Sequence, residues 1–411
     1  MLQSIIFFSI VFSVYGAFEY YGWQAVRTAF QPQNIKQAKW IYWGLSATLF
    51  ILFASYRPLL YKYLPKTFAT YFALVFVLLL LCKLIVFLFL FPEDVVRFFK
   101  FIVSKFSSSS EAVPGGISRS EFLSKFALFA AAIPAATLVY GVVVNAYNYR
   151  FRKLAIKYPN LPEAFNGFKI IQLSDIHSGS FTKTEPLVKV IEKINALDAD
   201  IILFTGDLVN NVSSEMEPFM EVFNKLKAKH GVISITGNHD YGDYVSWDTE
   251  AEKRANFEQF KGIHKNLGWD LLLNENRILE RNGEKIAIIG VENWGGGHFA
   301  KYGKFDLAYK GTEEIPFKIL MSHDPSSWDK RVRTEFPETD LTLSGHTHGA
   351  QFGVENKWLR WSPSQYIYKQ WAGLYNEGKQ FLYVNRGFGF LFYPGRVGIL
   401  PEVTEITLLR E

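Results

Sequence analysis

Four long apolar stretches in the first third of the chain constrain its fold more than any other feature. They lie at residues 2–18, 40–56, 71–91 and 126–144. A helix needs about 20 apolar residues to cross about 30 Å of hydrocarbon. The stretches therefore predict four transmembrane helices within a membrane region at 1–149, with a Ser-rich loop at 107–116. The first stretch lacks a basic leader and a cleavage site, which favours a retained span over a signal peptide.

The excess positive charge of the chain belongs to this membrane region. Residues 1–149 carry 12 Lys and Arg against 5 Asp and Glu, a net charge of +7, so the whole-chain charge of +5 leaves −2 for residues 150–411. Basic residues beside apolar spans are attracted by anionic lipid headgroups, whereas a nucleic-acid-binding protein carries a basic face on its soluble domain. We therefore expect membrane lipids as partners and no nucleic acid.

Two residues stand out within the third apolar stretch. Lys83 lies near its middle, where a cation is costly, and no Asp or Glu lies within any of the four stretches to pair with it. A structural lysine is favoured over a transport function, because one charge without an internal repeat is thin support for a transporter. Cys82 is the only cysteine. An intramolecular disulfide and a thiolate metal cluster are therefore excluded, and any metal must be bound by nitrogen and oxygen.

The membrane orientation depends on the basic residues beside the spans. Arg150, Arg152, Lys153 and Lys157 follow the last apolar stretch and predict a multi-pass protein with its C-terminal domain on the cytoplasmic face. The basic residues between the third and fourth stretches then lie outside. The extracytoplasmic face therefore stays open as the alternative.

Beyond Tyr158 the chain changes to short apolar runs that alternate with helical patterns, which is typical of an α/β domain. Five of these runs, at 169–173, 201–204, 232–235, 317–321 and 341–343, each lead directly into a polar motif. The motifs are Asp175-Ile176-His177, Gly206-Asp207, Gly237-Asn238-His239-Asp240, His323 and Gly345-His346-Thr347-His348. Open α/β sheets place their ligand sites at the carboxyl ends of the strands. Imidazole, carboxylate and amide groups suit Zn, Fe, Mn or Mg, so the motifs predict a metal centre.

Any one of these motifs has an ordinary explanation, since a lone histidine is usually structural and a lone Gly-Asp is usually a turn. Five of the eight histidines, however, lie in the motifs. The other three, His230, His264 and His298, are expected to be surface or structural residues. The glycines before the ligands permit tight turns and close approach of the backbone.

Together the motifs resemble the signature of the calcineurin-like metallophosphoesterases. The resemblance implies a four-layer αββα sandwich at 150–411 and an enzyme that hydrolyses phosphate esters or phosphoanhydrides with two divalent ions, namely Mn, Zn, Fe or Mg. It also implies that His239 protonates the leaving oxygen or stabilises the charge of the transition state, and that Asp240 orients His239. The implied ligands are Asp175, His177, Asp207 and His348 for the first ion, and Asp207, Asn238, His323 and His346 for the second.

The C-terminal segment is similar to a membrane-associated branch that includes the UDP-2,3-diacylglucosamine diphosphatases of lipid A synthesis. The similarity rests on 344–351, 385–389, Pro394, Arg396 and 401–402, while Ala350 departs from the glycine common there. It implies a phosphorylated, lipid-linked substrate such as UDP-2,3-diacylglucosamine. Arg386 and Arg396 are candidates to bind substrate phosphate, and loop-bracing arginines are an equal alternative.

Two further predictions concern the late aromatic residues and the rival function. The aromatic residues near the end of the chain are expected in the core rather than on a lipid-facing surface. The rival function is a membrane scaffold or receptor with an inactive phosphoesterase domain, whose usual mark is a lost ligand, and no ligand is missing here. The aromatic residues are Trp358, Trp361, Tyr366, Tyr368 and Trp371.

Overall fold

The computed structural model describes residues 2–55, 66–105, 119–297 and 299–411. The predicted loop at 107–116, the last residue of the predicted span 40–56 and His298 lie outside the described residues. The chain divides into two compact units, Met1–Val139 and Tyr140–Glu411. The predicted boundary after residue 149 falls at the start of strand β1 and stays a prediction.

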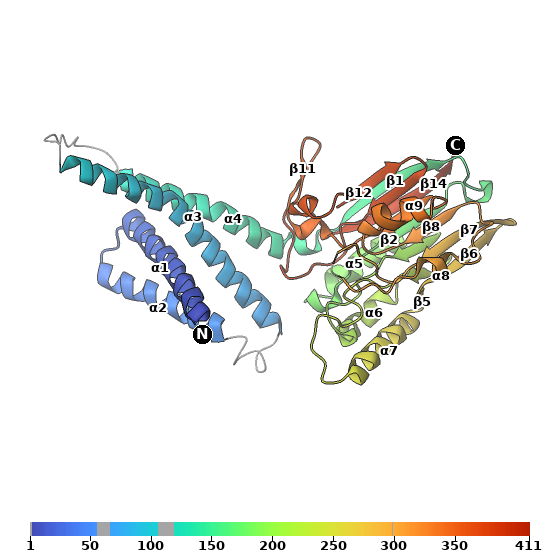
Figure 1. Cartoon of the computed structure of the whole chain (residues 1–411), viewed down its shortest axis with the longest axis horizontal. Helices are drawn as coiled ribbons and strands as arrows, with labels where there is room; N and C mark the ends of the chain where they lie inside the picture. The colour runs from blue at the N-terminus through green and yellow to red at the C-terminus, as the bar shows by residue number, and fades with distance from the viewer. Residues whose placement is uncertain (1, 56–65, 106–118, 298) are drawn as a thin grey trace. The chain divides into compact units, whose positions relative to one another are not determined.

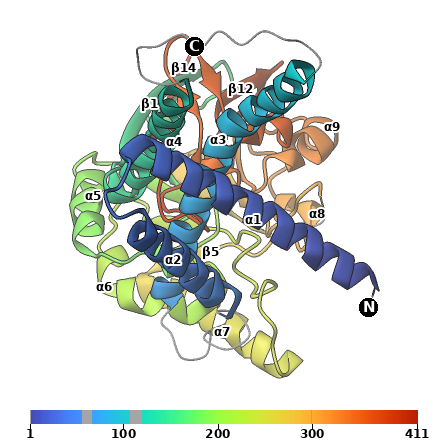
Figure 2. The ribbon, with the colours of Figure 1, turned by 90° about the vertical axis from the view of Figure 1, so that its left-hand side faces the viewer.

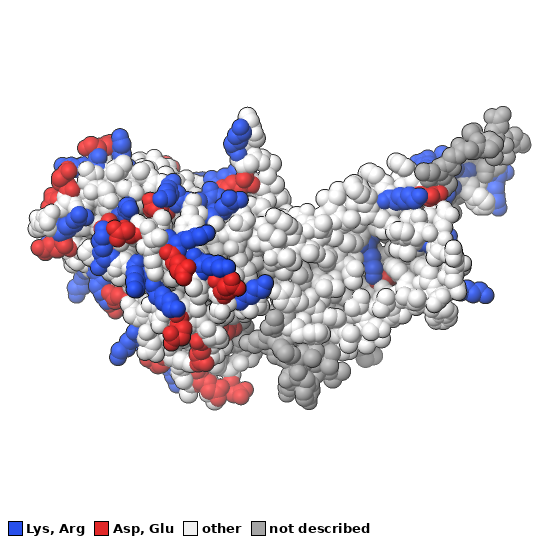
Figure 3. All heavy atoms as spheres, turned by 180° about the vertical axis from the view of Figure 1, so that it is seen from behind, with Lys and Arg blue, Asp and Glu red and all other residues white. Residues whose placement is uncertain are grey.

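The N-terminal unit consists of long helices. They are α1 (Leu2–Phe30), α2 (Ile35–Ser55), α3 (Lys66–Ser104) and α4 (Arg119–Val143), of which α1 packs against α2 and α3 (Figure 2). Among the described residues, Ile35–Ser55, Phe68–Val103 and Arg119–Val143 are long and apolar enough to cross a membrane. Few charged side chains lie on the face of these helices seen in Figure 3, whereas they crowd the surface of the other unit. The number of spans, four, stays a prediction.

Lys83 has a carboxylate partner, so the expectation that it lacks one is wrong. Its Nζ atom lies 2.5 Å from Oε1 of Glu19 and donates to Oγ of Ser46 at 2.9 Å. Glu19 directly follows the first apolar stretch, but α1 continues to Phe30 and therefore carries Glu19 inside the helix. The three residues come from α1, α2 and α3, and the ion pair links these helices.

The C-terminal unit contains two six-stranded sheets. In the first, β2, β3, β4 and β5 are parallel, while β14 pairs antiparallel with β2 and parallel with β1. In the second, β7, β8, β9 and β13 are parallel and antiparallel strands lie at both edges. The first sheet is ordered β1 (Arg150–Tyr158), β14 (Glu402–Arg410), β2 (Lys169–Leu173), β3 (Ile201–Phe204), β4 (Val232–Ser234) and β5 (Trp269–Leu271). The second is ordered β12 (Gly373–Glu377), β13 (Gln380–Val384), β9 (Leu341–Ser344), β8 (Lys318–Met321), β7 (Glu284–Gly290) and β6 (Glu275–Arg281).

The two sheets pack face to face, with helices on their outer faces (Figure 1). Neighbouring strand residues point to opposite faces, so Ile170 lies between the sheets while Ile171 packs under the helices. The outer face of the first sheet is covered by α5 (Glu185–Asn195), α6 (Met220–Phe223) and α7 (Glu250–Leu267). The outer face of the second is covered by α8 (Phe305–Tyr309) and the segment 328–336. The predicted four-layer αββα sandwich is confirmed.

Candidate metal centre

The predicted ligands lie on the turns that follow β2, β3, β4, β8 and β9. Asp175, His177, Asp207, His346 and His348 all have positive φ angles, between 48° and 69°. This left-handed conformation is uncommon for residues other than glycine and costs on the order of 1 kcal/mol each. Such strain persists only where the surrounding structure enforces it, and it is concentrated at functional sites.

The glycines before the ligands allow the turns to approach one another. A Cβ atom on Gly345 would collide with Oγ of Ser174 and Oδ2 of Asp175, and one on Gly237 would collide with Oδ1 of Asp207. Both glycines therefore provide room for a carboxylate from the end of another strand. This confirms the expected close approach of the backbone.

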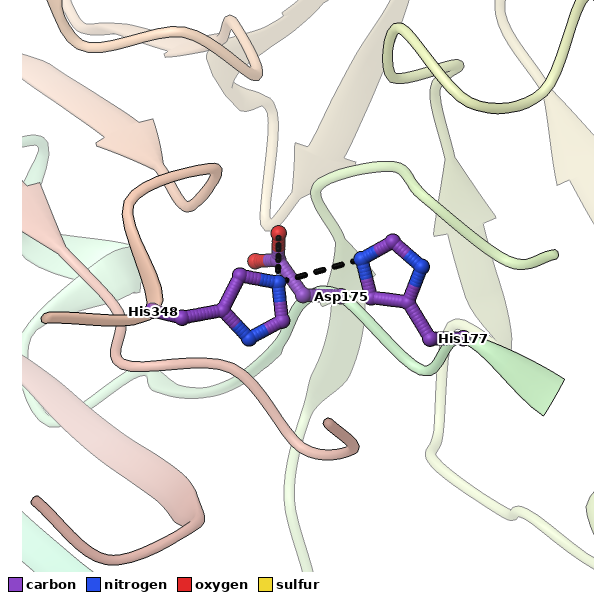
Figure 4. Close-up of side chains that lie close together, drawn as sticks. All are labelled: Asp175, His177 and His348. Atoms are coloured by element: carbon purple, nitrogen blue, oxygen red, sulfur yellow. Dashed lines mark hydrogen bonds and ion pairs between the residues drawn. The ribbon is translucent and has the colours of Figure 1, made fainter. Parts of the chain in front are cut away.

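The first cluster contains Asp175, His177 and His348, all buried (Figure 4). The Nε2 atoms of His177 and His348 lie 3.0 Å apart, and Nε2 of His348 lies 3.2 Å from Oδ1 of Asp175. Nδ1 of His177 is buried without a hydrogen-bond partner in the described part of the chain. Two imidazole nitrogens facing each other beside a carboxylate form a set of donors that a cation satisfies.

The second cluster contains Asp207, His323 and His346. Nε2 of His323 lies 3.0 Å from Oδ2 of Asp207 and 3.3 Å from Nδ1 of His346. The amide oxygen of Asn238 lies 2.8 Å from Nδ1 of His346 and adds an oxygen donor. The nitrogen and oxygen donor set again fits a divalent metal ion.

Asp207 lies between the two clusters. Its Oδ2 atom is 3.0 Å from Nε2 of His323 and 3.5 Å from Nε2 of His177. Burial alone would raise the pKa of this carboxyl, but His323 and His239 outweigh burial and hold the pKa well below its usual range. An ionised carboxylate in this position is suited to bridge two ions.

His239 lies beside the clusters but belongs to neither. Its Nδ1 atom lies 2.6 Å from the backbone carbonyl of Asn210. A carbonyl only accepts, so the proton of the neutral ring is on Nδ1 and the lone pair is on Nε2. The ring also lies against those of His177 and Tyr244, with centroids 5.0 and 4.5 Å away.

Asp240 has partners different from the one expected. Its carboxylate accepts the backbone N–H groups of Asp207, Leu208 and Gly237 at 2.8–2.9 Å and that of Val209 at 3.3 Å. It therefore holds the turn after β3 against the turn after β4. The partner of the His239 ring is the carbonyl of Asn210.

The two candidate substrate arginines are buried, with relative exposures of 2% for Arg386 and 0% for Arg396. Arg386 forms ion pairs with Glu402 at 2.6 Å and Glu355 at 2.5 Å. Arg396 donates to backbone carbonyls, including that of His348 at 3.3 Å, and lies 3.2 Å from Nδ1 of His348. These contacts match the alternative of loop-bracing arginines, and Arg396 also positions a candidate ligand.

Three further residues at this site were not among the predicted site residues. The hydroxyl of Tyr368 lies 2.7 Å from Nε2 of His346, and the hydroxyl of Tyr244 accepts from the amide of Asn238 at 2.8 Å. Asp324, which follows His323, lies 3.6 Å from Nε2 of His346. Only Asp324 carried a sequence signal, namely a carboxylate next to a predicted ligand.

The expectation that the late aromatic residues lie in the core is correct for Trp371 and wrong for Trp358 and Tyr366. Their relative exposures are 5%, 83% and 75%. The hairpin of β10 (Val354–Glu355) and β11 (Arg360–Trp361), whose backbone is drawn in Figure 1, and the residues on either side of it carry a group of exposed apolar side chains, here called the apolar hairpin surface. Its members are Phe352, Val354, Trp358, Leu359, Tyr366 and Ile367.

Comparisons with known proteins agree with this geometry. Residues 168–350 match the family model described as "Calcineurin-like phosphoesterase", and residues 3–146 match one described as "Probable Calcineurin-like phosphoesterase, transmembrane domain". The chain is 32% identical to "Uncharacterized metallophosphoesterase YkuE" of Bacillus subtilis, over 62% of this chain and 83% of that protein.

Two further relatives extend the comparison. A "Transmembrane protein with metallophosphoesterase domain" of Danio rerio is 29% identical over 75% of this chain and 67% of that protein. The "UDP-2,3-diacylglucosamine pyrophosphatase LpxG" of Chlamydia trachomatis is 29% identical over 56% of this chain and 81% of that protein. The chain belongs to the calcineurin-like metallophosphoesterases and is a metal-dependent phosphoester hydrolase with a membrane domain.

Proposed function

We propose that this protein hydrolyses a phosphate ester or phosphoanhydride bond of a lipid-linked substrate. The observation that carries the proposal is the apolar hairpin surface, whose last member, Ile367, directly precedes Tyr368 beside His346. Exposed aromatic and aliphatic side chains next to a phosphoesterase centre suit the acyl chains of a lipid substrate. The relative from Chlamydia trachomatis, named for UDP-2,3-diacylglucosamine, supports the same substrate class.

The predicted residues would hold two divalent ions, of Mn, Zn, Fe or Mg. Asp175, His177 and His348 would bind one ion and Asn238, His323 and His346 the other, with Asp207 shared between them. When bound, the ions supply charge neutralisation at the phosphoryl oxygens and lower the pKa of water. Arg396 keeps His348 in place, and Asp240 keeps Asp207 in place.

His239 would act on the leaving oxygen. Its Nδ1 proton is fixed by the carbonyl of Asn210, so Nε2 is the atom that gains and donates a proton. The backbone N–H of His239 donates to Oδ1 of Asp207 at 2.9 Å, which ties the position of the ring to the shared ligand. We thus assign general acid catalysis to His239 and a positioning role to Asp240.

The experiment compares UDP-2,3-diacylglucosamine with UDP-glucosamine, which lacks the acyl chains, using the full chain in detergent with Mn²⁺. The variant Trp358→Ser/Ile367→Ser should lower kcat/KM for the acylated substrate roughly ten- to thirtyfold and leave the other substrate unchanged, since each apolar side chain contributes on the order of 1 kcal/mol. The matched control Ile278→Ser/Leu307→Ser removes two exposed aliphatic residues elsewhere on this unit. Equal loss in both variants would reject the lipid contact, while turnover of neither substrate by the wild type would reject this substrate class.

The cytoplasmic placement of the domain also remains a proposal. Of the four basic residues that favour it, Arg152 pairs with Glu355 at 2.5 Å and Lys153 with Glu405 at 3.0 Å. The prediction therefore depends mainly on Arg150 and Lys157. Protease digestion of sealed, oriented vesicles tests it, because a cytoplasmic domain is cleaved only when its face of the membrane is exposed.

A further inference from the structure

A cavity of about 590 Å³ lies between α1 and α2 in the helical unit and shares no lining residue with the metal centre. Its charged lining is entirely basic, consisting of Arg27 from α1 and Lys36 and Lys39 from α2. Across the described residues, no carboxylate forms an ion pair with any of the three. Three cations gathered around one cavity repel each other, and an anion bound there relieves the repulsion.

The aromatic lining gives a second, independent indication of a ligand. Trp23, Trp40 and Trp43 line the same cavity. The indole N–H of Trp43 is buried and has no hydrogen-bond partner in the described part of the chain. A buried donor without an acceptor costs free energy, so a ligand that brings an acceptor oxygen to this position is stabilised.

The combination of tryptophan and basic residues is typical of the level of lipid headgroups. Tryptophan side chains concentrate at the membrane interface, and Lys and Arg attract anionic lipids there. The helix α2 is long and apolar enough to cross a membrane, and Trp40 on it is 80% exposed. The cavity therefore combines hydrogen-bond donors for phosphate with apolar surface for the adjoining part of a lipid.

We propose that this cavity binds the phosphate group of an anionic membrane lipid. Free phosphate has the same oxygen acceptors, but it makes no use of the three tryptophans, so the lipid is the occupant that the lining fits. The guanidinium of Arg27 and the ammonium groups of Lys36 and Lys39 bind the phosphate oxygens, and the N–H of Trp43 donates to one of them. The site is independent of the two metal clusters and of the substrate.

The test uses the full chain in a neutral detergent and counts bound lipid by native mass spectrometry. Phosphatidylglycerol is compared with phosphatidylcholine, in the presence and absence of inorganic phosphate. Phosphatidylglycerol should bind, phosphatidylcholine should bind much more weakly, and inorganic phosphate should not displace the lipid at an equal concentration. Displacement by phosphate alone would show a site for a free anion and overturn the lipid assignment.

Three variants locate the site. Lys36→Gln/Lys39→Gln should weaken phosphatidylglycerol binding roughly ten- to thirtyfold, because each lysine near the surface contributes on the order of 1 kcal/mol. Trp43→Phe replaces the indole by a smaller aromatic ring without an N–H, and should weaken binding without changing the melting temperature of the lipid-free protein. Lys100→Gln/Lys105→Gln removes the same charge outside the cavity and should leave binding unchanged. Equal losses in the two lysine pairs, or unchanged binding in Lys36→Gln/Lys39→Gln, would overturn the proposal.

Discussion

The Nδ1 atom of His239 lies 2.6 Å from the backbone carbonyl of Asn210, which assigns the ring proton and leaves Nε2 as the reactive nitrogen. The preceding residue, Asn238, instead directs its amide oxygen to His346 in the second cluster. Two adjacent side chains of one turn therefore have different roles, one as a candidate proton donor and the other as a candidate metal ligand. This difference makes them separable by mutation.

We expect His239→Ala to retain both metal ions and to slow turnover by about 10²- to 10⁴-fold, the usual range for general acid catalysis. The deficit should shrink for substrates with a good leaving group, because these need less protonation. Metal content and rates on a poor and an activated leaving group check the prediction. The control His230→Ala removes an exposed histidine of the same unit and should change neither quantity. Loss of one metal equivalent in His239→Ala would show that His239 is a ligand.

Because Asp207 faces both clusters, its replacement should change the metal content of the protein differently from the replacement of Asn238. Asp207→Ala should lose both ions, because its carboxylate faces His323 and His177 at once. Asn238→Ala should lose only the ion of the second cluster, with an affinity reduced by about 10- to 100-fold that excess metal restores. Elemental analysis of the purified variants at two metal concentrations distinguishes them. A full metal complement in Asp207→Ala would contradict the bridging assignment.

The strand-end motifs could be predicted from the sequence because each depends on residues adjacent in the chain. The apolar run 169–173 and the following Asp175 fix both a buried strand and its ligand, and β2 has the predicted bounds. Strand pairing within each sheet and the face-to-face packing of the two sheets then bring the five strand ends together. The fold class and the candidate ligands could therefore be predicted from short segments of the sequence.

Contacts between distant segments could not be predicted in the same way. Glu19 lies one residue beyond an apolar stretch, and only the observed length of α1 places it beside Lys83. The acceptors of Arg396 are backbone carbonyls. Because every residue has a backbone carbonyl, the sequence does not indicate which residues accept these hydrogen bonds. The exposure of Trp358 likewise follows from a hairpin whose two short strands have no distinctive pattern.

The ion pair of Glu19 and Lys83 predicts that single and double variants have non-additive effects on the stability of the helical unit. Glu19→Gln or Lys83→Met alone leaves one buried charge without its partner, which costs about 3–5 kcal/mol, whereas the double variant removes both charges and should be closer to wild type. Melting temperatures of the full chain in detergent should show this non-additivity. The control Glu121→Gln/Lys125→Met, at an exposed pair on α4, should be nearly neutral. Additive losses in the first double variant would mean that the two charges do not interact.

His264 on α7 predicts how the stability of the α/β unit depends on pH. Burial lowers its pKa to about 4, only partly offset by its hydrogen bond to the carbonyl of Phe260. In the unfolded chain the pKa of His264 is about 6.5. As the pH falls from 6.5 towards 4, His264 is therefore protonated in the unfolded chain but stays neutral in the folded chain. The stability is complete above pH 6.5 and should be lower by about 2 kcal/mol at pH 5.

The variant His264→Gln keeps a polar, neutral side chain at this position and removes the titration. Its melting temperature should fall less between pH 8 and pH 5 than that of the wild type, even if it begins lower at pH 8. His230→Gln, at an exposed histidine, should follow the wild-type profile and thereby control for the general effect of acid on the protein. Because the comparison concerns the slope against pH, a loss of packing alone cannot imitate the result. Parallel profiles for His264→Gln and the wild type would show that His264 does not carry this pH dependence.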